Sequence, residues 1–397
     1  MEKTREKPDI AAIEQGLNHG EFVFHYQPQI SLVSGQLLGA EALIRWMRPN
    51  GDMISPGDFL PLAEKTGLIT QITEMMIEQF AEDARIVQDV NDQVVMAMNV
   101  SPLDLESSQF QKALYHAVDR HRLKKSSLAI EITETAVMDH VDTQVYDFFS
   151  SLGIPLVMDD YGTGYANLAS LINTPFKKIK LDKSLVEDVM NNRKHYVIVK
   201  DQVRMAHRLG MEVVAEGVEY QDVYEFLQGI GCSTVQGFLI SKPMPLSRLM
   251  ELVADPENRW NGTPAGLLHL AQLDHIEWRK EIIDRAFKFN PEEDDPSTLY
   301  DETVINPTQC MLGRWYYGPG KIFGDMDEYK AVAQPHSELH MLGHQLISEA
   351  ARSPRELDRM LDIVRALSGQ SMEILNALQA MEDQLMANHL KQCDSYT

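Results

Sequence analysis

The chain has 397 residues, 44% hydrophobic and 24% charged, a composition that excludes collagen-like, disordered and disulfide-rich proteins and predicts two or three globular domains. Its formal net charge of −23 provides no basic face for a nucleic acid, so we expect neither DNA nor RNA as a partner. No apolar run reaches the ~18 residues that span a membrane, and only three cysteines are present, so we expect a cytoplasmic protein without membrane contact.

Strand-like and helix-like segments alternate from about residue 22 to residue 240. Apolar runs predict strands at Phe22–Ile30, Leu37–Ile44, Val94–Val100, Leu128–Thr133, Pro155–Met158, Lys178–Leu181, Glu212–Ala215 and Val235–Leu239. Apolar residues at helical spacing predict helical structure within Asp58–Asp89, Tyr196–Leu209 and Val223–Leu227. This alternation predicts an α/β fold, a closed (β/α)8 TIM-like barrel. An open doubly wound sheet is the alternative, weakened because no glycine-rich phosphate loop is present.

The pattern changes after the last expected strand. Pro243, Pro245, Pro256 and Pro264 mark a linker between about 243 and 266. Beyond it, Leu267–Phe289 and Leu357–His389 have helical spacing without strand-like runs, which predicts a separate all-α domain, a helical bundle. We therefore expect a barrel domain at 1–250, a linker at 251–266 and a helical domain at 267–397.

Polar side chains recur where the expected strands end. They are Glu41, Asn99, Glu131, Glu134, Asp159, Asp160, Lys180, Asp182, Glu216, Glu219 and Gln236. In a barrel these strand ends converge on one mouth, where crowded carboxylates raise each other's pKa unless cations bind between them. Oxygen ligands suit Mg²⁺ or Mn²⁺, and two such ions predict metal-assisted phosphoester hydrolysis. Lys180 could hold the attacking water, or form a salt bridge inside the barrel with Asp159 or Glu216.

A series of motifs makes the prediction more specific. In chain order they are Tyr26-Gln27-Pro28, Glu41-Ala42-Leu43-Ile44-Arg45-Trp46, Ser55-Pro56-Gly57-Asp58-Phe59-Leu60-Pro61-Leu62-Ala63-Glu64, Asn99-Val100-Ser101, Glu131-Ile132-Thr133-Glu134, Asp159-Asp160-Tyr161-Gly162-Thr163-Gly164, Lys180-Leu181-Asp182, Ala215-Glu216-Gly217-Val218-Glu219 and Gln236-Gly237-Phe238. This series covers about residues 15–250 and resembles the EAL-domain cyclic di-GMP phosphodiesterases of bacteria.

The EAL resemblance implies a barrel whose first strand runs antiparallel to the others, and hydrolysis of cyclic di-GMP to linear pGpG with two Mg²⁺ or Mn²⁺ ions. The metal ligands it implies are Glu41, Asn99, Glu131, Asp159 and Asp160, with Glu216 close by. The catalytic residues it implies are Glu41, Lys180, Glu216 and Glu134, with Lys180 on the nucleophilic water and Glu134 bracing the loop 160–164. The substrate contacts it implies are Gln27, Arg45 and Gln236.

Two residues depart from the EAL pattern, and the resemblance also bears on assembly. Tyr161 stands where Phe is usual, and Lys177 stands where an acidic residue is common. We expect Lys177 to affect the rate rather than the chemistry. The loop 160–164 also forms a dimer contact in the family, which implies a homodimer.

The C-terminal third carries a second set of candidate ligands. His336 and His340 are four residues apart, so on a helix they would share one face and could bind one metal ion. With Cys310 in Cys310-Met311-Leu312-Gly313-Arg314-Trp315 and with His275, this set resembles the chemoreceptor zinc-binding (CZB) domain, a four-helix bundle, over about residues 267–390. The resemblance implies one Zn²⁺ bound by His275, Cys310, His336 and His340.

The two resemblances together predict a signalling enzyme whose turnover of cyclic di-GMP is regulated through its zinc-binding bundle. A zinc-bound thiolate can be oxidised, and protonated histidines release zinc, so the input could be zinc, an oxidant or pH. The main alternative is a catalytically silent cyclic di-GMP receptor coupled to the bundle. A purely structural zinc in a constitutive enzyme is a third possibility.

Overall fold

The structure is a computed structural model that describes residues 8–134, 136, 143–162, 171, 174–255, 259–263, 265–295, 299 and 306–394. The chain divides into two compact units. The first comprises Met1–Gln228 and Cys232–Gly262, and the second comprises Gly229–Gly231 and Thr263–Thr397.

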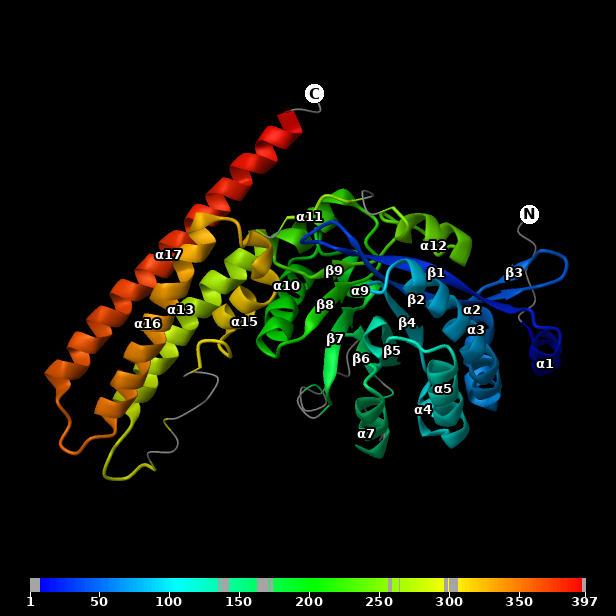
Figure 1. Cartoon of the computed structure of the whole chain (residues 1–397). Helices are drawn as coiled ribbons and strands as arrows, with labels where there is room; N and C mark the ends of the chain where they lie inside the picture. Colours follow the sequence, from blue (N-terminus) through cyan, green and yellow to red (C-terminus); the bar gives the residue numbers. More distant parts are fainter. Residues whose placement is uncertain are drawn as a thin grey trace. The chain divides into compact units, whose positions relative to one another are not determined.

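The first unit is a closed barrel (Figure 1). Its strands are β1 (Phe22–Ser31), β2 (Leu37–Met47), β4 (Val95–Asn99), β5 (Leu128–Thr133), β6 (Leu156–Tyr161), β7 (Phe176–Leu181), β8 (Glu212–Ala215) and β9 (Thr234–Val235). Neighbouring strands from β2 through β4 to β9 pair in parallel, and β1 closes the ring by pairing antiparallel with both β2 and β9. A short strand β3 (Met53–Ile54) extends from β2. The predicted barrel with one reversed strand is confirmed, and the open sheet is excluded.

Helices cover the outside of the barrel strands in Figure 1. They are α1 (Ile10–Asn18), α2 (Pro56–Thr66), α3 (Leu68–Val90), α4 (Pro102–Glu106), α5 (Ser108–Arg120), α7 (Thr143–Leu152), α9 (Lys183–Val186), α10 (Arg193–Arg208) and α11 (Gln221–Gly229), with a 3-10 turn, η1 (Lys125–Ser127). The helical stretch expected within Asp58–Asp89 is two helices, because Gly67 adopts φ 75° and ends α2.

Two expectations at the end of the barrel are wrong. Strand β9 has two residues instead of the expected Val235–Leu239, because the chain after it curls around Val218, whose carbonyl accepts from the amide of Leu239 at 3.0 Å. The linker expected from Pro243 begins with a helix, α12 (Leu246–Val253), for which Pro245 is the N-cap. Because Leu249 and Val253 are buried and α12 contacts β1 and α3, this segment belongs to the barrel unit.

The second unit is helical throughout its described residues, as predicted. Its helices are α13 (Ala265–Lys288), α15 (Met311–Tyr317), α16 (Asp327–Ala350) and α17 (Leu357–Asp394), with a 3-10 turn, η3 (Pro319–Phe323). Helix α13 packs against α15, α16 and α17, and α16 packs along α17. Their shared core includes the fully buried side chains of Leu268, Ile282, Val332, Leu339 and Leu346.

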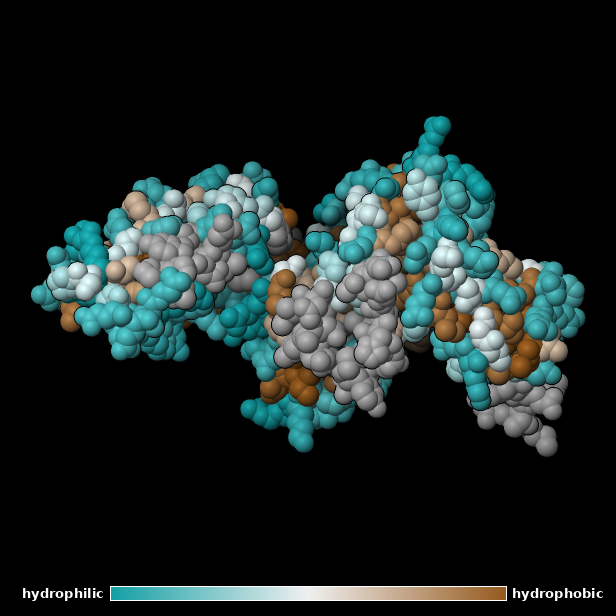
Figure 2. Space-filling model, turned by 90° about the horizontal axis from the view of Figure 1, so that it is seen from below, coloured by the Kyte–Doolittle hydropathy of each residue, from teal (hydrophilic) through white to brown (hydrophobic). Residues whose placement is uncertain are grey.

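The surface is consistent with the net charge of −23. On the face drawn in Figure 2, hydrophilic residues predominate and hydrophobic residues form small separate areas. Among the described residues, no helix combines the length and the apolar character needed to cross a bilayer.

Candidate functional site

A buried lysine organises the mouth of the barrel. Lys180 lies on β7, and its side chain has no solvent exposure. Its Nζ lies 2.8 Å from Glu131, 2.8 Å from Glu216, 3.1 Å from Asp159 and 3.2 Å from Glu41. The salt bridges to Asp159 and Glu216 that the sequence allowed are therefore present, within a larger cluster. Burial opposes the charge on Lys180, but the four carboxylates outweigh it and hold the pKa of the lysine well above its ordinary value.

The carboxylates form two overlapping groups that could each hold a cation. Ligand atoms of Glu41, Glu131 and Asp159 lie within 4.8 Å of one another, and the same is true of Asp159, Asp160 and Glu216. Asp159 belongs to both groups. Oxygen donors at this spacing fit Mg²⁺ or Mn²⁺, so the donor set suits two neighbouring divalent ions that share one ligand.

Glu41 is held in place by amide groups. Asn99 Nδ2 donates to Glu41 Oε1 at 2.6 Å, and Gln236 Nε2 donates to Glu41 Oε2 at 2.5 Å. Burial favours the neutral acid, but Lys180 and the two amides outweigh it and hold the pKa of Glu41 below its ordinary value. Gln236 Nε2 also donates to Gln27 Oε1 at 3.1 Å, so two of the predicted substrate contacts lie side by side.

The other carboxylates of the cluster have raised pKa values. Burial is the largest cause for all four and the charges of neighbouring carboxylates add to it, while Lys180 opposes the rise without cancelling it. The pKa of Glu131 is well above its usual range, that of Asp159 is raised, that of Asp160 rises to about 6 and that of Glu216 to about 8. Asp160 also has φ 55°, a left-handed conformation that a non-glycine residue rarely adopts. The site therefore holds acidic groups that a divalent cation would stabilise in their charged form.

Glu134 contacts the loop that follows β6. Its Oε2 accepts from the amide of Gly162 at 2.9 Å, which agrees with a bracing role for this side chain. Gly162 has φ 98°, so the turn at this point needs glycine. The rest of the predicted loop, Thr163 and Gly164, lies outside the described residues.

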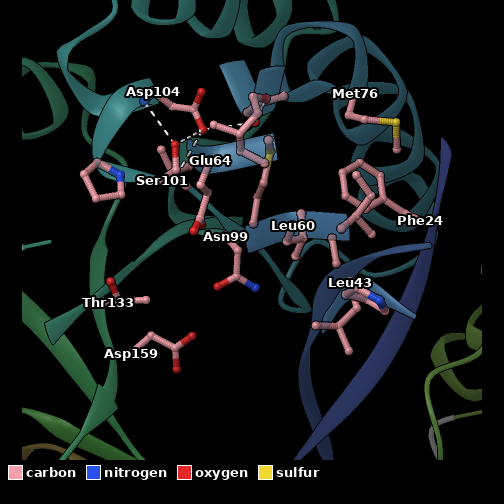
Figure 3. Close-up of a pocket in the computed structure, with 18 of the residues that line it drawn as sticks. Phe24, Leu43, Leu60, Glu64, Met76, Asn99, Ser101, Asp104, Thr133 and Asp159 are labelled. Carbon is pink, nitrogen blue, oxygen red and sulfur yellow. Dashed lines mark hydrogen bonds between the residues drawn. The ribbon is translucent and has the colours of Figure 1, made fainter. Parts of the chain in front are cut away.

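A cavity of about 270 Å³ opens beside the carboxylate cluster (Figure 3). Asn99, Asp159 and Asp160 line this cavity, and so does Arg45. Burial lowers the pKa of Arg45, and the charge of Glu41 opposes that shift. The cavity thus joins the candidate metal ligands to a cation suited to a phosphate group.

The same cavity contains two acidic residues that the sequence analysis did not assign. Asp104 is fully buried, and its Oδ2 accepts from the amide and hydroxyl of Ser101 and from the hydroxyl of Thr73. Its Oδ1 has no hydrogen-bond partner among the described residues. Burial, with the charge of Asp104, raises the pKa of Glu64 nearby. Ser101 and Asp104 also form the capping box at the start of α4, and a capping spacing in a sequence does not by itself indicate a ligand contact.

The bundle contains a cluster of soft donors. Cys310 Sγ lies 3.2 Å from His336 Nε2, and ligand atoms of Cys310, His336 and His340 lie within 4.8 Å of one another. All three side chains are buried. Burial raises the pKa of the Cys310 thiol to about 11 and lowers the pKa of His336 to about 3. A buried thiol with neutral imidazoles fits Zn²⁺, which binds the thiolate and the neutral ring.

His275, the fourth expected zinc ligand, lies outside that group of three. It is buried on α13, and its Nε2 lies 2.9 Å from Ser371 Oγ on α17. Burial, together with the charges of Arg279 and His340, lowers the pKa of His275 to about 4. His344 is exposed, in agreement with its having no place in the expected ligand set.

Comparison with known proteins identifies the family. The model of the EAL domain matches residues 10–243. The chain belongs to the EAL-domain family. The model of the chemoreceptor zinc-binding domain matches residues 275–347, so both resemblances seen in the sequence are confirmed.

Individual relatives are similar to the EAL region. The chain is 36% identical over 245 residues to the bifunctional diguanylate cyclase/cyclic di-GMP phosphodiesterase MucR of Pseudomonas aeruginosa, covering 61% of this chain and 36% of that protein. It is 32% identical over 248 residues to the cyclic di-GMP phosphodiesterase RocR of the same species, covering 62% and 63%.

A solved structure extends this comparison to the fold. The MucR phosphodiesterase in complex with cyclic di-GMP is similar with a TM-score of 0.58 and 35% identity, covering 60% of this chain and 98% of that one. The chain spans only 36% of the curated MucR protein, so the likeness concerns one domain of that relative.

Proposed function

We propose that this chain hydrolyses cyclic di-GMP to linear pGpG with two divalent metal ions, Mg²⁺ or Mn²⁺. The observation that carries the proposal is the pair of carboxylate groups that share Asp159 in the lining of a cavity. The relatives MucR and RocR are named as enzymes that act on cyclic di-GMP, which supports the same substrate here.

In this proposal Glu41, Asn99, Glu131 and Asp159 bind one ion, and Asp159, Asp160 and Glu216 bind the other. Bound divalent cations would lower the pKa of water and neutralise charge on the phosphate. Lys180 would lie next to the attacking water and hold the carboxylates in position. Gln27, Arg45 and Gln236 would contact the substrate, with Arg45 on a phosphate oxygen.

We also propose that Asp104 contacts a guanine base. Guanine presents N–H donors at N1 and at the exocyclic amine, and Oδ1 is the oxygen of Asp104 that remains to accept one of them. Asp104 Oδ1 supports this assignment because it is buried in the lining of the cavity and has no bond among the described residues. Glu64 lies close enough to Asp104 for the two charges to interact, and it could accept from the same edge.

The decisive experiment measures cyclic di-GMP turnover by the purified chain with Mg²⁺ or Mn²⁺. Glu41→Ala removes a ligand and should lower turnover by orders of magnitude. Glu212→Ala is the matched control, because Glu212 begins strand β8, is 57% exposed and pairs with Lys178 away from the cluster. Equal turnover in Glu41→Ala and the parent would refute the assigned site, and binding without turnover in the parent would favour the silent receptor.

For the bundle we propose that Cys310, His336, His340 and His275 bind one Zn²⁺ and that zinc occupancy regulates turnover in the barrel. Three of these side chains already cluster, which supports the metal site. We propose further that the protein acts as a homodimer in the cytoplasm.

A further inference from the structure

Ser371 is a polar residue on an otherwise apolar face of α17. Over residues 357–384, where side-chain burial is described, the residues that this helix buries completely are Met360, Leu367, Ser371, Ile374, Leu378 and Met381. Ser371 follows Leu367 by four residues and precedes Ile374 by three, so it lies on the same helical stripe. A buried hydroxyl destabilises the fold unless it forms hydrogen bonds, so its partners indicate what this side chain does.

Both partners of Ser371 belong to α13. Arg279 Nη1 donates to Ser371 Oγ at 3.3 Å, and His275 Nε2 lies 2.9 Å from the same oxygen. Because a guanidinium can only donate, Ser371 accepts that bond and keeps its hydroxyl hydrogen for another acceptor. Within the described part of the chain, His275 Nε2 is the acceptor in reach. In the tautomer of His275 that carries its proton on Nδ1, the Ser371 hydroxyl donates to the lone pair of Nε2.

A metal ion would need the lone pair of a ring nitrogen of His275. Donor atoms around one tetrahedral zinc lie roughly 3.3–3.8 Å apart, since Zn–N and Zn–S bonds are about 2.0–2.3 Å long. Among the described residues, the ligand atoms of Cys310, His336 and His340 lie within 4.8 Å of one another. His275 does not belong to this group. The ring of His275 must therefore shift to complete the site, while Ser371 holds it by Nε2.

We propose that Ser371 competes with the metal ion for His275 Nε2, so that zinc binding breaks the hydrogen bond between α13 and α17. This inference rests on the proposed zinc site and adds a residue beyond the 275–347 match to the zinc-binding domain. It makes α17 sensitive to zinc although α17 supplies no ligand. Release of Ser371 leaves a buried hydroxyl with only its Arg279 bond, so α17 packs less firmly against α13 in the zinc-bound protein.

The test compares Zn²⁺ affinity in the full chain, measured by competition with a chromophoric chelator. Ser371→Ala should raise the affinity roughly 2- to 10-fold, because one competing hydrogen bond is removed. Ser368→Ala is the matched control, since the Ser368 hydroxyl donates to the carbonyl of Val364 in its own helix and should leave the affinity unchanged. In a His275→Ala background, Ser371→Ala should have no effect.

Three results would overturn the competition. They are unchanged affinity in Ser371→Ala, an equal rise in Ser368→Ala, or a loss of roughly 10- to 100-fold in Ser371→Ala, as expected if Ser371 positions the ring for binding through Nδ1. Imidazole ¹⁵N spectra of the parent test the same point without a variant, because zinc should move the Nε2 resonance of His275 to a metal-bound position.

The zinc site itself is tested separately. Binding of Co²⁺ with a thiolate charge-transfer band that disappears in Cys310→Ser would support the site whatever the result for Ser371. If the parent shows no such band, the proposed zinc site is wrong, and the competition fails with it.

Discussion

Without divalent cations, the barrel unit should lose stability as the pH rises from about 4.5 to about 8. Four carboxyl groups have raised pKa values in the folded protein: Glu131, Asp159, Asp160 and Glu216. Each binds its proton more tightly in the folded than in the unfolded chain, so the folded state loses stability as the pH rises through the folded pKa. Glu41 and Lys180 do not oppose this trend. The lowered pKa of Glu41 affects stability only below pH 4.5, and the raised pKa of Lys180 affects it only above pH 10.5.

Glu216 alone shows how large the effect of one group is. Its pKa rises from 4.5 to about 8, and at 1.36 kcal/mol per pH unit this corresponds to a loss on the order of 5 kcal/mol across that range. Its side chain is only 17% exposed, so solvent screens the effect little. Glu216→Gln should reduce the slope and leave the part that comes from Glu131, Asp159 and Asp160, while Glu212→Gln at the outer end of β8 should keep the full slope.

The assay is urea unfolding with a chelator at pH 5, 6, 7 and 8. Replacing Trp278 and Trp315 by Phe leaves Trp46 and Trp260 as reporters, both in the barrel unit. Saturating Mn²⁺ should flatten the pH dependence, because the bound cation favours the ionised carboxylates. If the stability of the metal-free barrel is constant or rises from pH 5 to 8, Lys180 alone neutralises the cluster and our reasoning is wrong.

Other predictions concern the metal sites and the assembly. Asp159→Asn should abolish turnover and weaken Mn²⁺ binding more than Asp160→Asn, and unchanged calorimetric binding in both would contradict a two-metal site. Cys310→Ser should lower zinc affinity and change turnover by about 5- to 150-fold at saturating zinc, whereas unchanged turnover would make the zinc purely structural. Gly343→Ala places a Cβ 2.6 Å from Ile282 and should destabilise the bundle by about 1–3 kcal/mol, measured by thermal unfolding. Light scattering at micromolar concentration should give the mass of a dimer, and a monomer mass would contradict the proposed assembly.

Much of the barrel could be predicted because its strands are short apolar runs that end in polar residues. The pattern that placed Glu41, Glu131 and Asp159 at strand ends needs only parallel strands to bring them together, and the structure groups all three. The direction of a strand could not be predicted in this way, since nothing in the composition of Phe22–Ile30 distinguishes an antiparallel strand from a parallel one. That feature came from the EAL resemblance alone.

The two wrong expectations, the length of the last strand and the start of the linker, have physical causes that the pattern of apolar residues does not reveal. Val235–Leu239 is apolar enough for a strand, and the amide of Gln236 still donates to Ala215 in β8. Beyond that point the amide of Leu239 donates to Val218 in a loop instead of to a neighbouring strand. Prolines at 243 and 245 resemble a linker, yet proline also precedes helices, and α12 begins directly after Pro245. Asp104 and Ser371 were missed because their roles depend on partners far away in the sequence.

The reversed strand β1 decides when the site can form during folding. Its pairing with β2 is a local hairpin, but its pairing with β9 joins Ile30 to Val235 across most of the barrel sequence. Contacts so distant in sequence form slowly, because a long loop must close first. Gln236, which bonds to both Gln27 and Glu41, follows directly after β9. A ribosome-bound chain therefore cannot complete the substrate site before its last barrel strand has emerged, and ring closure and assembly of the site become one event.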